Sequence, residues 1–570
     1  MKKILFPVLF LFVATMLASC DSGGTGNFKI KLRLPFDDGI CEYHDDSEDN
    51  TYCIHETDQI LLTTYTSATP SGEYVYSDRK LIRVKSDRGG KEEFVRSLKS
   101  GIYYRFFVEV TNANEKLKLT GGIDSILYED NKNFEADIFL GAVGDFVRVI
   151  KKDGSNFSSL ETYFDISYGS KGSGAASIKN GKLYLSGGYC FEKERVVADA
   201  MVFDLKNFSS KKAASLGIGV MDHTVSFLDD GSETGKVVIA FGSAEDGPIN
   251  SIRIYDPDKD KYREIGYGDR ITKAKSITID GDVYIAGGCN KEAASQKVYR
   301  VYNKNKGTDL VADIVSEEYS TLKTGRCNHA IADVSYTKED GAFVPRILIV
   351  GGSTDEDGRS PVKGDKFAEV VEASSSKQVT VTDRTGEDSS DLLNQGLISP
   401  GASAVVMDDL ETPETVVAVV GGYLEDEKED TKTFIPSPNL YVLSEKGDGE
   451  WIYDTNASPS ECARPSMGTI GAVEKSVIKY AAVNCGAEHV SRNNSVEQVI
   501  FVVQVKRNFD KELGKDIFSA SVKESLMDGN RDNEETVSIV DGPVAVNELG
   551  QAFIFGSQYI YQVSSYAVPN

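Results

Sequence analysis

Residues that could do chemistry are few in this chain of 570 residues. The five histidines stand at positions 44, 55, 223, 329 and 489, and neither an HExxH nor a CxxC pattern occurs. Such patterns bring metal ligands together within one local element, so the sequence argues against a zinc centre. We expect neither a cofactor nor a metal, and we favour a protein without enzymatic activity.

Three acidic residues with alternate spacing, Asp256, Asp258 and Asp260, are similar to the start of a calcium loop. Such a loop continues with a glycine and ends on a bidentate acid, whereas this chain has Lys261 and Tyr267 at those positions. We predict a solvated hairpin turn instead.

The beginning of the chain has the order of a secretory signal peptide. Lys2 and Lys3 precede an apolar run over residues 4–18, and Leu-Ala-Ser then leads to Cys20. Residues 17–20 resemble a bacterial lipobox, which implies that residues 1–19 are removed and that the Cys20 thiol carries a diacylglycerol. An ordinary cleavage site beside a chance cysteine is the alternative.

The lipid would hold the glycine-rich tether, residues 20–27, at a membrane of the bacterial cell envelope. We favour the outer membrane or the cell surface. Asp21 resembles an inner-membrane retention signal of some bacteria, so that membrane is kept as an alternative. The formal net charge of −25 argues against a nucleic-acid partner. An acidic surface also resists association with anionic lipid, so we expect the lipid anchor to provide the contact with the membrane.

A short apolar run that ends in glycine recurs along most of the chain. The strong copies end in Gly-Gly, and the weaker ones have lost one glycine. The runs are 183–188 (LYLSGG), 283–288 (VYIAGG), 347–352 (ILIVGG), 416–422 (VVAVVGG), 237–243 (VVIAFGS), 480–486 (YAAVNCG) and 552–557 (AFIFGS). Spacings of roughly 45 to 70 residues suit an array of four-stranded units. Each run predicts a strand that is buried on both faces.

These runs resemble the Kelch repeat, in which a strand ends in Gly-Gly and a tyrosine then precedes a tryptophan by a hairpin. Tyr441 and Trp451 follow this order, and Arg326 with His329 supplies the Arg-x-x-His that opens many repeats. The resemblance implies an all-β fold with a β-propeller of about seven blades over residues 144–570. We expect residues 145–160 to supply the outermost strand of the last blade and so to close the ring.

Residues 28–143 lack the glycine runs, and alternating stretches such as 28–34 and 103–110 predict half-buried strands. An antiparallel β-sandwich of immunoglobulin or fibronectin type fits this pattern. We expect it to act as a spacer between the membrane and the propeller.

Seven cysteines besides Cys20 are consistent with a few disulfides in an oxidising compartment. Cys41 and Cys53 flank an acidic loop and would close it locally. In a propeller, the start of an inner strand and the end of a second strand share one face, which implies the pairs Cys462–Cys485 within a blade and Cys289–Cys327 across two blades. Cys190 would be left over, and buried free thiols are the alternative.

His223 and His329 both begin expected inner strands, and the Kelch-like galactose oxidases bind copper through two histidines. No nearby run matches the copper site of that family, so we predict histidines that are hydrogen-bonded between blades. The stretch 444–451 (SEKGDGEW) has only a superficial likeness to a sialidase turn.

Two long loops, after Gly352 and after Gly422, should rise on one face of the ring, where loops often carry specificity. The candidate binding residues on them are Asp355, Glu356, Asp357, Arg359, Tyr423, Glu425 and Asp426. We expect a binding or interaction module whose partner is a protein or glycan of the envelope. A carbohydrate-active enzyme and a purely structural envelope protein are the alternatives.

Overall fold

The computed structural model describes residues 27–33, 58–69, 73–83, 93–114, 117–129, 134–142, 146–148, 174–190, 194–206, 209–232, 234–305, 311–372, 374–383, 393, 395–408, 413–428, 431–447, 450–462, 465–470, 477–485, 499–511, 515–523, 543–555 and 560–564. The predicted signal peptide, Cys20, Cys41 and Cys53 lie outside these residues. Strands dominate the part described, with two short 3-10 turns, η1 (Val311–Asp313) and η2 (Gly364–Lys366). The chain is therefore all-β, as the sequence indicated. None of the described helical segments is long and apolar enough to cross a bilayer.

Two sheets form the N-terminal part of the fold. The first has the order β4 (Glu93–Ser97), β1 (Asn27–Arg33) and β7 (Phe134–Phe139). The second has the order β3 (Val75–Arg83), β2 (Gln59–Ser67), β5 (Ile102–Thr111), β6 (Leu117–Tyr128) and β8 (Gly141–Ala142). Side chains of both sheets, among them Ile30, Ile60, Phe106 and Ile138, share one buried cluster.

The expectation of a wholly antiparallel N-terminal domain was wrong for one pair of strands. β1 pairs with β7 in parallel, from Phe28 opposite Phe134 to Arg33 opposite Phe139. Parallel neighbours need a long crossover, and the chain between β1 and β7 is long enough to supply one. Local alternation predicts a strand but does not set the direction of its distant partner.

Antiparallel groups of four strands follow one another along the rest of the described chain, and the fourth and fifth groups share one larger sheet. In order they are β10 (Ala175–Lys179), β11 (Lys182–Ser186), β14 (Ala200–Asp204) and β15 (Ser209–Lys212); β16 (Thr224–Leu228), β17 (Lys236–Ala240), β20 (Ser251–Asp256) and β21 (Lys261–Tyr267); β22 (Lys275–Ile279), β23 (Asp282–Ala286), β24 (Lys297–Asn303) and β25 (Ile314–Thr321); β26 (Ala330–Asp333), β29 (Arg346–Val350), β30 (Ala368–Glu372) and β31 (Ser375–Asp383); β32 (Gly401–Met407), β33 (Glu414–Val420), β35 (Thr431–Gly447) and β36 (Glu450–Cys462); β37 (Ser466–Ile470), β38 (Ile478–Cys485), β39 (Val499–Asp510) and β40 (Lys515–Lys523); and β41 (Val544–Val546), β42 (Ala552–Phe555), β43 (Ile560–Val563) and β9 (Phe146–Arg148).

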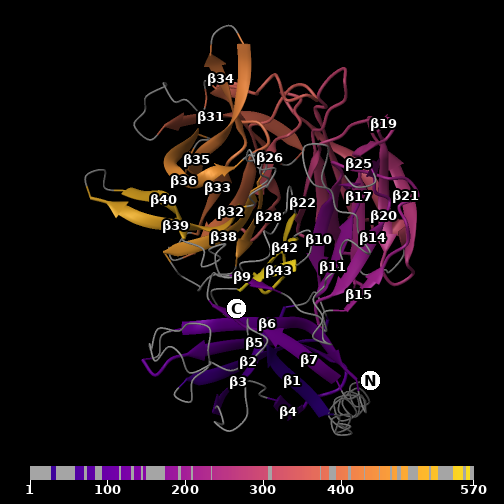
Figure 1. Cartoon of the computed structure of the whole chain (residues 1–570), viewed down its shortest axis with the longest axis vertical. Helices are drawn as coiled ribbons and strands as arrows, with labels where there is room; N and C mark the ends of the chain where they lie inside the picture. The colour runs from indigo at the N-terminus through magenta and orange to yellow at the C-terminus, as the bar shows by residue number, and fades with distance from the viewer. Residues whose placement is uncertain are drawn as a thin grey trace, which may run out of the picture.

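These sheets are arranged in a ring (Figure 1). The first strand of each sheet contacts the first strand of the next, and β41 contacts β10, which closes the circle. Hydrophobic clusters lie between neighbouring sheets: Tyr184 and Val202 pack against Phe227 and Val237 of the following sheet. This β-propeller-like packing explains why second strands such as β17 and β23 are buried along their whole length.

The ring is closed by strands from both ends of the chain. β9 pairs with β43, with Val147 opposite Gln562. β9 falls within residues 145–160, the segment in which the sequence placed the closing strand. Outer strands also join across one seam, because β31 runs parallel to β36 from Thr380 opposite Glu450.

Short hairpins connect the longer strands: β12 (Tyr189–Cys190) with β13 (Arg195–Val196), β18 (Ser243–Ala244) with β19 (Gly247–Pro248), β27 (Tyr336–Thr337) with β28 (Phe343–Val344), and β34 (Tyr423–Lys428) with β35. The segment after Gly422, which we expected to be a long loop, thus forms a hairpin.

The N-terminal sheets lie against one end of the ring (Figure 1). Gln551, in the turn between β41 and β42, donates to the carbonyl oxygen of Gly122 at 3.5 Å. Gln562 donates to the carbonyl oxygen of Phe139, also at 3.5 Å. The first strand of each group, such as β41, is the inner strand of the ring, and it ends in a turn on the side that faces the N-terminal sheets. The first residues of the inner strands and the glycine pairs therefore lie at the opposite end of the ring.

Candidate functional site

The glycine pairs allow neighbouring sheets to approach closely. The backbone N–H of the second glycine, or of its equivalent, donates to a carbonyl oxygen that precedes the next inner strand. The bonds run from Gly188 to Val220 at 2.8 Å, Gly242 to Ile271 at 3.1 Å, Gly288 to Arg326 at 2.9 Å, Gly352 to Leu397 at 2.8 Å and Gly422 to Cys462 at 2.7 Å. The repeated glycine motif is therefore a contact between sheets as well as a turn.

Gly287 shows why side chains are excluded there. Its φ is +61°, and a Cβ on it would collide with the carbonyl oxygen of Arg326 and lie 2.8 Å from Cε1 of His329. L-residues with a Cβ rarely adopt that φ, and the neighbouring backbone leaves no space for the atom.

Four polar residues with left-handed backbones stand at equivalent places, two residues before the inner strands β16, β22, β26 and β32. Asp222, Lys273, Asn328 and Ser399 have φ values of +51°, +58°, +50° and +55°. The N–H of Lys273 donates to the carbonyl oxygen of Asp222 at 3.0 Å, that of Asn328 to Lys273 at 3.4 Å, and that of Ser399 to Asn328 at 2.6 Å. We call these four residues the mouth arc.

The mouth arc borders a central cavity of about 700 Å³, which is lined further in by the inner strands. Hydroxyl groups bridge neighbouring strands along its wall. The hydroxyls of Thr224 and Ser276 form a hydrogen bond, and Ser403 Oγ lies 2.6 Å from Thr469 Oγ1. Asp357 lines the cavity from the loop after Gly352, while Tyr423 and Phe434 line it from the β34–β35 hairpin.

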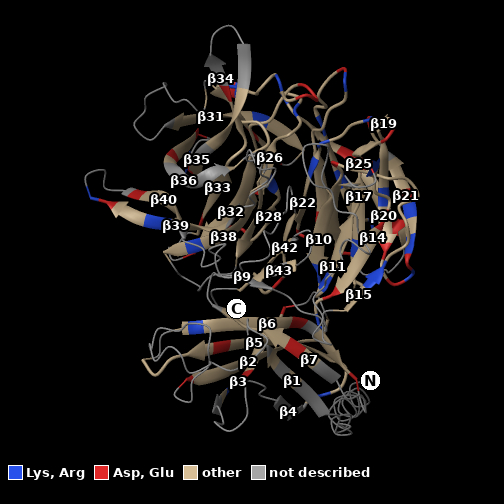
Figure 2. Cartoon of the chain, viewed as in Figure 1, with Lys and Arg blue, Asp and Glu red and all other residues tan. Residues whose placement is uncertain are grey.

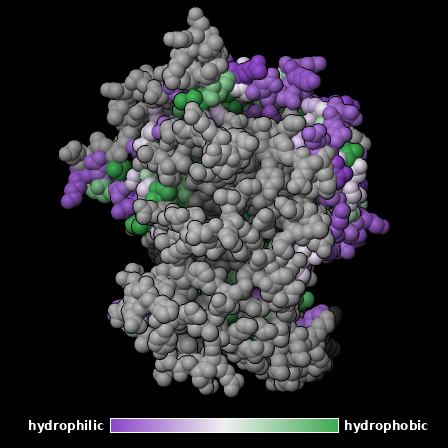
Figure 3. Space-filling view, in the orientation of Figure 1, coloured by the Kyte–Doolittle hydropathy of each residue, from purple (hydrophilic) through white to green (hydrophobic). Residues whose placement is uncertain are grey.

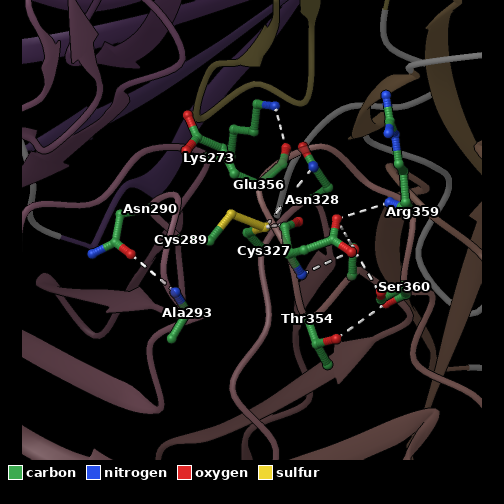
Figure 4. The surroundings of a disulfide bond; sticks show 12 residues. Lys273, Cys289, Asn290, Ala293, Cys327, Asn328, Thr354, Glu356, Arg359 and Ser360 are labelled. Carbon is green, nitrogen blue, oxygen red and sulfur yellow. Dashed lines mark hydrogen bonds between the residues drawn. A yellow bond between two sulfur atoms is a disulfide. The ribbon is translucent and has the colours of Figure 1, made fainter.

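A disulfide fixes the base of the loop after Gly352 (Figure 4). Cys289 and Cys327 are bonded with a Cα–Cα distance of 5.5 Å, and they join two neighbouring sheets. Cys327 exchanges backbone hydrogen bonds with Ser353 at 2.9 and 2.8 Å. The Nζ of Lys273 donates to the carbonyl oxygen of Glu356 at 2.8 Å, so the mouth arc itself holds this loop.

Asp355 stabilises the loop through hydrogen bonds to its carboxylate. Its carboxylate accepts from the N–H of Arg359 at 2.8 Å and from Ser353 Oγ at 3.2 Å. Burial alone would raise the pKa of Asp355, but hydrogen bonds from Ser360, the Arg359 backbone and Ser353 bring this pKa below its ordinary value. Such bonds to the ionised form are typical of a turn-stabilising carboxylate.

Two of the other predicted binding residues, Glu425 and Asp426, lie in strand β34. Glu425 is 2% exposed and forms an ion pair with Lys363. Asp426 lies in β34, where its backbone pairs with Thr433. Arg359 is exposed beside the mouth. The structure thus brings Asp357 and Tyr423 to the cavity, and it places Asp355 and Glu425 in supporting positions.

The second described disulfide joins Cys462, at the end of β36, to Cys485, at the end of β38, with a Cα–Cα distance of 5.1 Å. Both described disulfides are pairs that the propeller geometry implied. Cys462 and Cys485 lie on strands of two different sheets, however, and not within one blade as expected. Cys190 lies in β12, opposite Arg195.

The two histidines in the cavity wall are buried between sheets. His223 Nε2 lies 2.9 Å from Ser186 Oγ of the preceding sheet, in agreement with the structural interpretation of this residue. Burial lowers the pKa of His223 to about 4. Burial, with the nearby charges of Arg326 and Lys275, places the pKa of His329 well below its usual value. Both ring nitrogens of His329 are buried and no described residue forms a hydrogen bond with them, so the expected hydrogen bond between blades was wrong for His329. Within the described residues, no group of three or more histidine, cysteine or acidic side chains could hold a metal ion.

A buried ion pair beside His329 escaped the sequence analysis. Arg326 Nη2 lies 3.2 Å from Glu369 Oε2, and both side chains have no exposed surface. Arg326 also donates to the carbonyl oxygens of Gly351 and Phe367 at 3.1 Å and to that of Lys366 at 2.8 Å. The Arg-x-x-His motif signals Arg326, but nothing local in the sequence points to Glu369.

The acidic turn between β20 and β21 is a hairpin, as predicted, but Asp256 is not solvated. It is 3% exposed, and its carboxylate lies 3.6 Å from Lys236 Nζ and 2.9 Å from Lys259 Nζ. Two lysines therefore occupy the place that a cation would need.

Comparison with known proteins adds little to this site. No known family model matches the sequence, and no curated protein matches it either. Solved structures do match, among them one described as the structure of YjhT, with 10% sequence identity and a TM-score of 0.39, covering 63% of this chain and 100% of that chain. The identity is too low to transfer any residue's role from that chain.

Proposed function

We propose that this protein is a binding module that takes a polar ligand at the mouth of the central cavity. The observation that carries the proposal is the mouth arc, four polar side chains on left-handed backbones around one opening. Such backbones cost about 1–3 kcal/mol each and tend to persist where they serve a function.

The chemistry of the opening favours a glycan among polar ligands. Carboxylate, amide and hydroxyl groups of Asp357, Asn328 and Ser399 can exchange hydrogen bonds with sugar hydroxyls. Tyr423 and Phe434 add aromatic surface for the apolar face of a sugar ring. A projecting loop of an envelope protein is the competing ligand.

We further propose that residues 144–570 form a seven-bladed Kelch-like β-propeller, with a spacer sandwich over residues 28–143. The ring of first strands, the clusters between sheets and the glycine contacts support this interpretation. The parallel β1–β7 pair requires a sandwich with mixed strand directions.

The proposed location is the bacterial cell envelope, with a lipid on Cys20 as the anchor and the outer membrane or cell surface favoured. The two disulfides support an oxidising compartment. The N-terminal sheets would stand between anchor and ring, and the mouth would point away from them. Cys20→Ala should move the protein from the membrane fraction to the soluble fraction; continued sedimentation with membranes would contradict the anchor.

Glycine substitution within the mouth arc tests the binding function without a folding penalty. Asn328→Gly with Ser399→Gly removes both polar side chains, while glycine accepts a positive φ readily. We expect unchanged or raised thermal stability and a loss of glycan-array signals. Ser374→Gly, at φ +66° on an exposed turn away from the cavity, is the matched control and should keep every signal.

The alternatives give different results in the same experiment. If the double variant retains all bound glycans, the mouth arc is not the binding site. If the arrays are blank and crosslinking at the mouth captures an envelope protein, the glycan assignment is wrong. Turnover of a bound glycan would make the protein an enzyme.

A further inference from the structure

A second depression lies outside the central cavity, between the outer parts of two neighbouring sheets. It has a volume of about 760 Å³ and separates the end of β25 from η2 and the start of β31. Lys323, Lys366 and Lys377 line it, and we call it the lysine groove. Hydrophilic residues predominate on the described surface at the upper right of the ring (Figure 3).

The charge of the lysine groove contrasts with that of the chain, whose formal net charge is −25. Glu292 is the one acidic residue that lines it, against three lysines. On outer strands such as β21, by comparison, basic and acidic residues are interspersed (Figure 2).

The three lysines are exposed, and no carboxylate among the described residues forms an ion pair with them. Some lysines elsewhere in the ring are neutralised: Lys236 lies 3.2 Å from Asp230, and Lys297 lies 3.1 Å from Asp269. The ammonium groups at the groove are therefore not neutralised by the described part of the chain, and they are available to bind an anion from solution.

The floor of the groove is fixed by the buried ion pair. Glu369 accepts from the backbone N–H groups of Lys323 and Thr324 and from the hydroxyl of Ser376. Arg326 neutralises Glu369, so the floor adds no net negative charge beneath the lysines.

The remaining walls carry neutral polar groups. Gln378 Nε2 donates to Thr324 Oγ1 at 2.9 Å, and Gln296 Nε2 donates to the carbonyl oxygen of Lys323 at 3.2 Å. Thr354 also lines the groove and belongs to the loop that carries Asp357 to the central cavity. The groove lacks a large apolar side chain in its lining.

We propose that the lysine groove is a separate binding site for an anionic glycan, one that bears carboxylate or sulfate groups. Lysine ammonium groups match such anions as strong charge-assisted donors, and the amides and hydroxyls match sugar hydroxyls. An acidic peptide fits less well, because its apolar side chains would find no pocket. The site is additional to the cavity mouth and does not depend on ligand binding there.

The test measures binding of the purified full chain to polygalacturonate, dextran sulfate and uncharged dextran at low and high salt. We expect both polyanions to bind at low salt, uncharged dextran not to bind, and high salt to weaken binding. The carboxylate and sulfate arms identify which anion the groove prefers. K323E/K366E/K377E should weaken binding by about tenfold or more.

Matched variants separate the groove from the general charge of the chain. E292K should strengthen binding, whereas K261E, an exposed lysine on the remote strand β21, should leave it unchanged. If the triple variant fails to fold, K323Q/K366Q/K377Q replaces it and should still weaken binding.

Three results would overturn the proposal. The first is equal binding by the folded triple variant and the unchanged protein. The second is equally tight capture of uncharged dextran. The third is polyglutamate binding through the same lysines as tightly as either polyanionic glycan, which would assign the groove to an acidic peptide.

Discussion

His223 and His329 each fill the space that two consecutive glycine motifs leave at a seam of the ring. A Cβ on Gly187 would collide with Cε1 of His223, and one on Gly242 would lie 2.7 Å from its Cβ. The glycines are therefore required as much by the neighbouring imidazole as by their own backbone. Ala274 and Pro400 stand at the equivalent places after Lys273 and Ser399, which explains why the motif does not require a histidine.

Substitution of one such glycine should be costly. Gly287→Ala adds a Cβ against Arg326 and strains a left-handed backbone, and we expect a loss of about 2–4 kcal/mol in the free energy of unfolding. Gly217→Ala has a φ of +81° but open space around the new atom, so it should cost only about 1 kcal/mol. Urea unfolding of both variants measures the difference, and equal losses would refute the packing argument.

The buried histidines also predict how stability depends on pH. His223 has a pKa of about 4 when folded, below the usual value near 6.5, so the unfolded chain binds the extra proton between these values. Stability should be complete above about pH 6.5 and decline as the pH falls towards about 4. His223→Gln should flatten this decline in urea unfolding midpoints. An identical slope in the variant and the unchanged protein would show that the imidazole does not contribute.

At the scale of elements, the disulfides join residues at the connections between strands. Cys289–Cys327 closes a sequence separation of 38 residues and links two sheets, while Cys462–Cys485 closes 23 residues. Loop closure in the unfolded chain predicts a stabilisation of about 3–4 kcal/mol for each. We expect Cys289→Ala with Cys327→Ala to lower the urea midpoint without changing the strand content.

The position of this disulfide also predicts a local effect that the other one lacks. Cys327 pairs with Ser353 at the base of the Asp357 loop, so its loss should expose this loop to proteolysis. Cys462→Ala with Cys485→Ala provides the control, because it should destabilise the fold while the loop stays protected. Equal cleavage of the Asp357 loop in both double variants would argue against a specific role for Cys289–Cys327.

At the scale of the whole molecule, ring closure depends on the short pairing of β9 with β43. Proline at Val147 removes a backbone donor from the closing strand, and we expect a lower melting temperature and faster proteolysis. Lys211→Pro makes the same change in β15, the outermost strand of another sheet, and should be milder. Calorimetry of the two variants makes the comparison, and equal shifts would mean that closure adds no stability.

Local patterns in the sequence predicted the strands, and the resemblance to the Kelch repeat implied the closing segment and the two described disulfide pairs. The apolar composition of runs such as 283–288 is enough to predict that these strands are buried. Because the runs recur, equivalent positions can be aligned from one repeat to the next. The direction of β1 against β7 and the hairpin after Gly422 required the fold, because strand partners far apart in sequence are chosen by packing. The mouth arc has no common residue type, since Asp222, Lys273, Asn328 and Ser399 share only a backbone conformation. Likewise, the Arg326–Glu369 pair and the lysine groove join residues from separate strands, and only the tertiary structure brings their charges together.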